Sequence, residues 1–175
     1  GNVQTTNWQI APTYDVPAGG LIRVRFAVTD TTRVHKLALP DVPGRIVAWD
    51  GHPFEEDIAW PTVEEPLFLG PGQRVDVVLV APAEEGREVP LTGVLGKTPF
   101  TIATLRSTGR NLGRSVQDIR PLPRNPISIP DLDNAGYHEF VFGWTPEGGV
   151  SNNGVCGVFE DVFWSINRTP WPGDA

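Results

Sequence analysis

The stretch Gly70-Pro-Gly-Gln-Arg-Val-Asp-Val-Val-Leu-Val80 decides the expected fold. Its Gly-Pro-Gly opening is a turn signal, because proline presets one backbone angle and glycine adopts turn conformations without steric cost. Residues 74–80 are mostly valine and leucine, and such a run directly after a turn predicts a strand. A turn that leads into a buried strand indicates β structure in this part of the chain.

A second strand is expected over residues 21–28, where the side chains alternate in character. Every second residue from Ile22 to Val28 is apolar, and Arg23 and Arg25 occupy positions between them. A period of two places one face against a core and the other in solvent, as in a half-buried antiparallel strand. Further strands are expected over residues 34–39, 45–49, 89–95, 100–105, 139–144 and 161–166.

The composition fits a globular β protein. Hydrophobic residues make up 39% and charged residues 20% of the 175 residues, which is ordinary for a folded domain. The 19 glycines and 18 prolines interrupt helices and favour short strands joined by turns. We find no helical periodicity. The expected fold class is therefore all-β, a sandwich or barrel.

Three regions are expected along the chain. Residues 1–107 hold most of the strands and form one domain. Arg, Pro, Asn and Gly dominate residues 108–136, which we expect to be an extended connector. Residues 137–175 contain two strand candidates, too few for a core, so we expect them to be the opening strands of a following domain. The chain begins with Gly1 and has no methionine, which predicts a processed chain or a piece of a longer protein.

Charge and cysteine content narrow the function classes. The net charge of −7 disfavours nucleic acid as a partner, because phosphate binding needs a basic surface. The single Cys156 cannot form an internal disulfide, and no apolar run approaches the roughly 18 residues of a membrane helix. Five arginines lie in a stretch interrupted by glycine and proline, and we interpret them as solvated: Arg106, Arg110, Arg114, Arg120 and Arg124.

Four segments resemble, in the same order, parts of the laccase-like multicopper oxidases. Residues 16–25 are similar to the family's glycine-containing turn and its strand of alternating arginine and apolar residues. Residues 45–53 resemble a strand that ends in Asp-Gly-x-Pro, and residues 69–78 resemble the Pro-Gly-Gln/Glu-Arg turn with its strand. Residues 163–171 resemble the opening of the third domain, except that Arg168 stands where the family has glycine.

The resemblance implies the second cupredoxin domain of a three-domain oxidase, followed by the start of the third. It implies a cupredoxin-like Greek-key β-sandwich or barrel with an extended C-terminal tail. The parent would be a copper-dependent oxidoreductase that oxidises its substrate one electron at a time and reduces O2 to water. This domain would be a scaffold bordering the substrate cleft, and its partners would be neighbouring cupredoxin domains of the same parent chain. The expected location is periplasmic or extracellular.

The chain's own residues lack the copper ligands of that family. A blue-copper centre needs two imidazoles and a thiolate, and the chain offers His35, His52, His138 and Cys156. The family places a histidine shortly after the cysteine, and none follows Cys156. The His-x-His pairs of its trinuclear cluster, which the resemblance assigns to other domains, do not occur here. We interpret the histidines as structural or surface residues. We predict no catalytic, cofactor-binding or metal site in this chain, copper only in the parent, and no activity of the fragment alone.

Other polar and aromatic residues receive structural interpretations. The acidic trio at residues 55–57 could hold calcium or act as paired carboxylates, but a solvated patch is the simpler explanation. Arg74 and Asp76 share a strand face and are expected to form ion pairs with neighbours. Residues 167–169 fit a glycosylation sequon, followed by Pro170. Four tryptophans could line a groove, but packing explains them more simply: Trp49, Trp60, Trp144 and Trp171.

Two other function classes stay open. An independent β-sandwich could bind carbohydrate or protein through its tryptophans, and it would need no copper ligands after residue 175, whereas the oxidase requires them there. A stand-alone cupredoxin electron carrier needs a downstream histidine and methionine, which the chain lacks. Unpaired strands within residues 139–172 are expected to associate with the domain edge or with a second copy.

Overall fold

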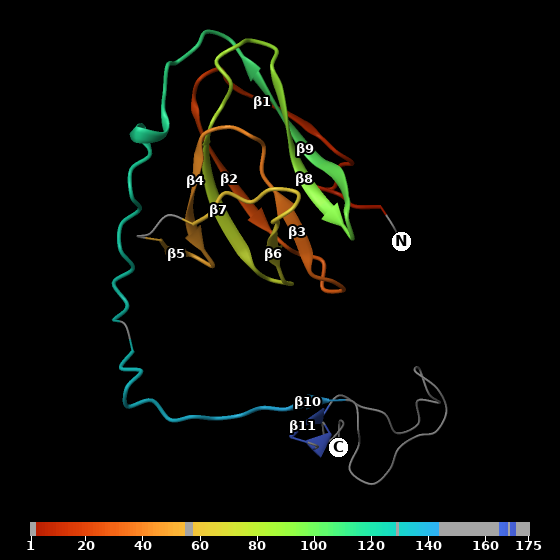
Figure 1. Ribbon diagram of the computed structural model, residues 1–175, viewed down its shortest axis with the longest axis vertical. Coiled ribbons are helices and arrows are strands. Elements are labelled where there is room, and N and C mark those ends of the chain that lie inside the picture. The colour runs from red at the N-terminus through yellow and green to blue at the C-terminus, as the bar shows by residue number, and fades with distance from the viewer. Residues whose placement is uncertain (1–2, 55–57, 129, 144–164, 168, 171–175) are drawn as a thin grey trace. The chain divides into compact units, whose positions relative to one another are not determined.

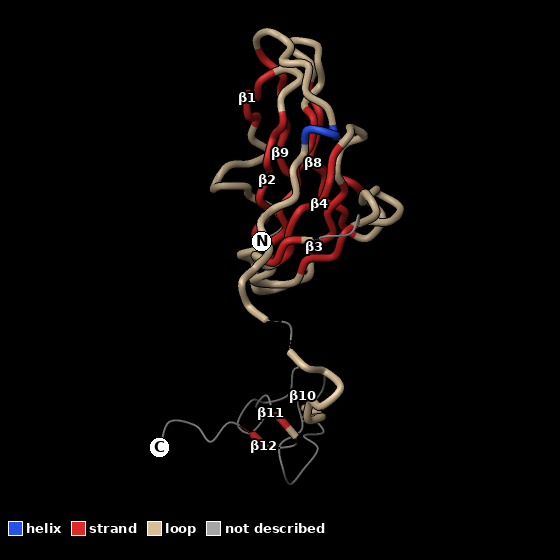
Figure 2. Tube along the Cα trace, turned by 90° about the vertical axis from the view of Figure 1, so that its left-hand side faces the viewer, coloured by secondary structure: helices blue, strands red, loops and turns tan. Residues whose placement is uncertain are grey.

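The computed structural model describes residues 3–54, 58–128, 130–143, 165–167 and 169–170. The chain divides into two compact units, Gly1–Pro126 and Ile127–Ala175, and each is described by itself (Figure 1). Strands dominate the first unit, and the one helix among the described residues is the short 3-10 helix η1 (Val116–Asp118) (Figure 2). None of the described helical residues forms a segment with the length and apolar character of a membrane span.

The strands of the first unit form two sheets. The five-stranded sheet has the order β1-β9-β8-β3-β6 and consists of β1 (Thr13–Pro17), β9 (Thr98–Thr108), β8 (Glu88–Leu95), β3 (His35–Ala38) and β6 (Leu67–Leu69). The four-stranded sheet has the order β2-β7-β4-β5 and consists of β2 (Leu21–Ala27), β7 (Arg74–Val80), β4 (Gly44–Trp49) and β5 (His52–Pro53). The chain crosses between the sheets at most connections. β1 and β9 are parallel, and the other pairs are antiparallel.

Alternate residues of the strands build the core between the sheets. Val75, Val77 and Leu79 of β7 are fully buried, and β2 packs its apolar face from Ile22 to Val28 against the same cluster. Burial of each such side chain contributes roughly 1.5–3 kcal/mol relative to leaving it exposed. The all-β architecture expected from the sequence is confirmed, with two sheets in the first unit, and burial alternates along β7.

Two tight turns fix the ends of these strands. In the turn before β7, the Gln73 N–H donates to the Gly70 carbonyl at 3.1 Å, and Gly72 adopts φ +80°, as a type II turn requires. Asp50 and Gly51 adopt φ values of +48° and +86° in the two-residue turn that joins β4 to β5. The turn before β7 was expected from the sequence, whereas β5, which is only two residues long, was not.

The irregular chain after β9 packs onto the first unit. The Leu112 N–H donates to the Ala18 carbonyl at 2.8 Å, and the Arg114 N–H donates to the Gly19 carbonyl at 2.9 Å. Ile119 is only 7% exposed. The expected connector over residues 108–136 is therefore irregular, but its first part packs on the first unit. The five arginines of residues 106–124 are exposed, as the sequence indicated.

The second unit contains three strands of two residues each among its described residues. These are β10 (Phe142–Gly143), β11 (Ser165–Ile166) and β12 (Thr169–Pro170), paired antiparallel in that order. Asn167 joins β11 to β12, and its side chain and backbone both bond to the backbone of Val141 at 2.8 Å. The strands expected over residues 139–144 and 161–166 lie partly outside the described residues.

Candidate functional site

A cleft with a volume of about 610 Å³ lies between the sheets of the first unit. Residues of the five-stranded sheet, such as Leu91 and Gly93 of β8, line one side. Consecutive residues of β2 and of the segment after it line the other side. Trp8, which is 96% exposed, lies at the border of the cleft. The lining is mostly apolar, which suits burial of apolar groups rather than acid–base chemistry.

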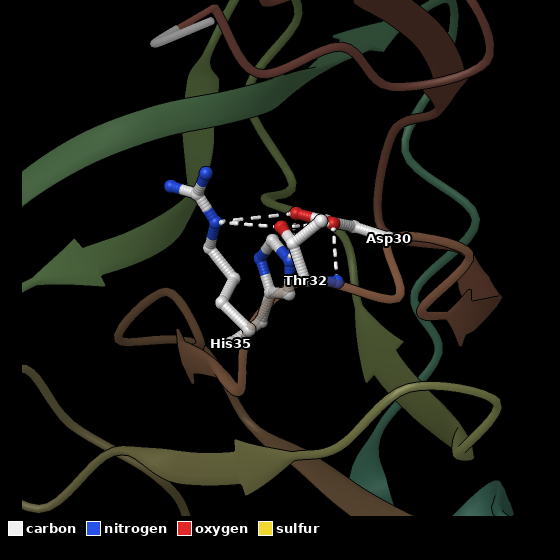
Figure 3. A network of polar contacts seen from close by, with 4 residues as sticks. Asp30, Thr32 and His35 are labelled. Carbon is white, nitrogen blue, oxygen red and sulfur yellow. Dashed lines mark hydrogen bonds and ion pairs between the residues drawn. The ribbon is translucent and has the colours of Figure 1, made fainter. Parts of the chain in front are cut away.

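A polar network lies beside this cleft, in the loop between β2 and β3 (Figure 3). The Asp30 carboxylate accepts hydrogen bonds from the Thr32 N–H at 2.9 Å and from its Oγ1 at 2.6 Å. The carboxylate also lies 3.2 Å from His35 Nε2 and 3.3 Å from Arg33 Nε. The hydrogen bonds from Thr32 lower the pKa of Asp30 to about 2. Asp30 is therefore ionised at neutral pH and anchors this loop.

The histidines lie in different parts of the fold. His35 is on β3 of the five-stranded sheet and contacts Asp30. His52 is on β5, at the end of the other sheet, with its Nδ1 3.3 Å from Asn125 Nδ2. His138 is exposed in the second unit. The described part of the chain brings no three His, Cys, Asp or Glu side chains together as a metal-binding group.

The remaining sulfur and acidic candidates cannot be placed. Cys156 and the acidic trio at residues 55–57 lie outside the described residues. A copper centre of the blue type needs two imidazoles and a thiolate in one place. His35 and His52 sit on separate sheets, so the described imidazoles of the first unit do not fit that ligand set.

The ion pair expected near Asp76 is confirmed. Asp76 lies on β7 opposite Arg25 of β2, and its Oδ2 accepts a hydrogen bond from Arg25 Nε at 3.1 Å. The Arg23 guanidinium binds the same oxygen atom. Arg74 contributes differently, since its backbone N–H donates to Asp50 Oδ1 at 2.8 Å. One carboxylate therefore faces two guanidinium groups on the outer face of this sheet.

The tryptophans named from the sequence are only partly described. Trp49 and Trp60 pack against the core, and Trp60 Nε1 donates to the Pro40 carbonyl at 2.9 Å. Trp144 and Trp171 lie outside the described residues. The sequence analysis missed the Asp30 network, although an aspartate two residues before a threonine is a common turn signal. It also missed the cleft, because no local pattern reports a gap between two sheets.

Comparisons with known proteins add to this geometry. No family model and no curated protein matches the chain. Among solved structures, a multi-copper oxidase from Pseudomonas thermotolerans is 35% identical with a TM-score of 0.65, over 83% of this chain and 33% of that one. Over most of its length the chain is similar to multicopper oxidases. Its cupredoxin-like fold agrees with that of the oxidases it matches.

Two further multicopper oxidase-type structures show the same partial coverage. Lac15 from a marine microbial metagenome is 25% identical with a TM-score of 0.56, over 68% of this chain and 30% of that one. A multicopper oxidase from Campylobacter jejuni, described as a metallo-oxidase, shares the fold at 20% identity and a TM-score of 0.62, over 98% and 36%. The chain thus spans about a third of these oxidases.

Proposed function

We propose that this chain is the copper-free middle domain of a multicopper oxidase, joined to the opening strands of the domain that follows. Its role is that of a scaffold, which holds the neighbouring cupredoxin domains and borders the substrate cleft. The parent oxidises its substrate one electron at a time and reduces O2 to water, with copper bound by the neighbouring domains. A periplasmic or extracellular location belongs to the same proposal and rests on the family resemblance.

The proposal rests on one contrast: the chain resembles copper enzymes, but its described histidines do not form a copper ligand set. The chain is similar to multicopper oxidases over most of its length but matches only about a third of theirs. His35 and His52 lie on different sheets and bond to Asp30 and Asn125 respectively. A domain that resembles these oxidases, and whose described residues form no copper ligand set, can contribute geometry rather than electron transfer.

A repeated turn supports the interpretation of residues 137–175 as the start of another domain. Thr6 and Gln9 pair across a two-residue turn that begins with Asn7 at φ +49°. β11 and β12 pair across a turn that begins with Asn167 at φ +54°. Asparagine tolerates this left-handed conformation better than most residues. A turn that begins with a left-handed asparagine thus occurs both before β1 of the first unit and near the end of the second unit.

Self-association through residues 139–172 is a further part of the proposal. Among the described residues of this region, four large apolar side chains are exposed: Phe140, Val141, Phe142 and Ile166. Short strands with an apolar surface are stable only when other strands or another surface cover them. In the parent, the rest of the following domain would supply that cover. In the isolated chain, a second copy takes its place.

The proposal is tested by copper loading of purified residues 1–175. We expect well under one copper per chain after dialysis, no intense visible band, and no oxidation of a phenolic dye. The His35→Ala/His52→Ala variant should retain the same trace copper. One tightly held copper per chain with an intense visible band, lost in that variant, would overturn the proposal.

A further inference from the structure

Strand β2 (Leu21–Ala27) forms an open edge of the four-stranded sheet. It pairs with β7 along its whole length, from Leu21 opposite Val80 to Ala27 opposite Arg74. Among the described residues, no strand pairs with its other side. The strand has no proline, so the backbone groups on that side are free to bond to a further strand.

The 610 Å³ cleft runs along this open edge. Every residue from Ile22 to Val28 lines the cleft, including those whose side chains face outward. In contrast, β1 contributes only Tyr14 and Val16, which lie on one face of their strand. Successive side chains of a strand point to opposite faces, and β2 is the outermost strand of its sheet, so a cleft that touches both alternating sets of β2 residues reaches around this edge.

The two faces of β2 differ in chemistry. Toward the cleft, the strand presents Val24 and Phe26 beside the core. On the outer face lie Arg23 and Arg25, and both bind the carboxylate of Asp76. The Arg25 side chain is still 71% exposed. Two guanidiniums around one carboxylate leave a net positive charge at this edge, within a chain whose net charge is −7.

We propose that the open edge of β2 docks an extended segment of a protein partner, which adds to the sheet as a further strand. The segment carries apolar side chains toward the cleft and acidic side chains next to Arg23 and Arg25. Main-chain hydrogen bonds hold it in place, and the alternating side chains give selectivity. The apolar side chains cover the cleft, and the acidic ones neutralise the excess positive charge.

Charge selects this partner over a second copy of the same strand. If β2 paired antiparallel with β2 of another copy around Val24, Arg23 of one strand would lie opposite Arg25 of the other. Like charges directly opposite each other are destabilising. An acidic and apolar segment avoids this repulsion and also covers the cleft.

The test uses residues 1–175 and a capped heptapeptide, Glu-Val-Glu-Val-Glu-Val-Glu. We expect saturable binding by isothermal calorimetry, with slowed amide exchange in β2. A peptide with lysine in place of glutamate should not bind. Neighbouring residues of a strand direct their N–H groups to opposite sides. We therefore compare two N-methylated peptides, one methylated on the valines and the other on the glutamates. Only the peptide whose methyl groups replace the N–H groups that face β2 should lose binding.

Two double variants distinguish a contribution of the β2 edge to peptide binding from a contribution of the net charge. Arg23→Gln/Arg25→Gln should weaken binding about tenfold, as expected from the loss of two opposite-charge pairs. The control Arg87→Gln/Arg110→Gln makes the same change in net charge at exposed arginines that do not line the cleft, and it should bind like the parent chain. Circular dichroism checks that both variants are folded. The proposal is wrong if no peptide binds, if both methylated peptides bind equally, or if both variants weaken binding alike.

Discussion

At the scale of single residues, Asp30 shows how a short polar motif organises a loop. Its carboxylate accepts two hydrogen bonds from Thr32 and lies close to His35 and Arg33. These contacts favour the charged form, which is why its pKa falls from 3.8 to about 2. His35 Nε2 belongs to this network through its 3.2 Å contact with Asp30, and the interpretation of His35 as a structural or surface imidazole stays a prediction.

The lowered pKa of Asp30 makes a pH-dependent contribution to stability. A carboxyl group whose pKa is lower in the folded than in the unfolded state stabilises the fold above its unfolded value of about 3.8. That contribution disappears as the pH falls through about 2. Asp30→Asn should therefore be less stable than the parent chain at pH 6, and the difference in urea unfolding should shrink between pH 4 and pH 2.

Carbon-detected NMR titration gives the direct check on Asp30. Thr32→Val removes the hydroxyl donor but keeps the backbone N–H, so the pKa of Asp30 should rise part of the way toward its ordinary value. A pKa near 3.8 for Asp30 in the unmodified chain would contradict the described network.

At the scale of elements, the clearest strands are those with alternating patterns. β2 was predicted from its alternating apolar residues, and β7 was predicted from a valine- and leucine-rich run directly after a turn. β1, β5 and β6 were missed. Two of them are only two or three residues long, and β1 ends in proline. Short strands acquire their structure from the neighbours they pair with, so their own residues carry little signal.

The chain after β9 has almost no regular structure, but it is attached to the first unit by hydrogen bonds and by a buried side chain. Ile119 is buried, and backbone bonds from Leu112 and Arg114 attach the segment to the turn between β1 and β2. Ile119→Ala should lower the free energy of unfolding by about 2–5 kcal/mol, as for other buried isoleucines. Leu132→Ala, at a position 73% exposed, is the matched control and should change it by at most about 0.5 kcal/mol.

Urea unfolding followed by tryptophan fluorescence measures both substitutions. Equal and small effects would mean that residues 109–119 are a free linker in solution. That result would favour the domain end at residue 107 that the sequence analysis predicted.

At the scale of the whole molecule, the two units differ in how they are held together. The core cluster of the first unit lies within β1–β9 and the loops between them, and the second unit shows only two-residue strands in its described part. A shortened chain ending at Pro126 should therefore unfold with the same urea midpoint as the first unit of the full chain. It should also remain monomeric in sedimentation equilibrium, whereas the full chain should associate. A fall of more than about 1 kcal/mol in stability, or association of the shortened chain, would contradict this prediction.

Several features of this protein follow from the sequence alone. The alternation in residues 21–28 and the valine- and leucine-rich run of residues 74–80 after the Gly70–Gln73 turn were sufficient for an all-β fold, because strand pattern and turn chemistry are local properties. The order of family-like segments was sufficient for the relation to multicopper oxidases, which the solved structures support. The small number of possible copper ligands, three histidines and one cysteine with no methionine, is a property of the composition itself.

Tertiary structure alone decided the rest. The parallel pairing of β1 with β9 joins residues about ninety positions apart, and the contact between Asp76 and both arginines depends on the register of β2 against β7. The docking of residues 109–119 depends on carbonyls of the β1–β2 turn. The cleft along β2 is lined by strands of both sheets, which come from distant parts of the chain. These features arise between segments distant in sequence, and a local pattern contains no information about which distant groups will meet.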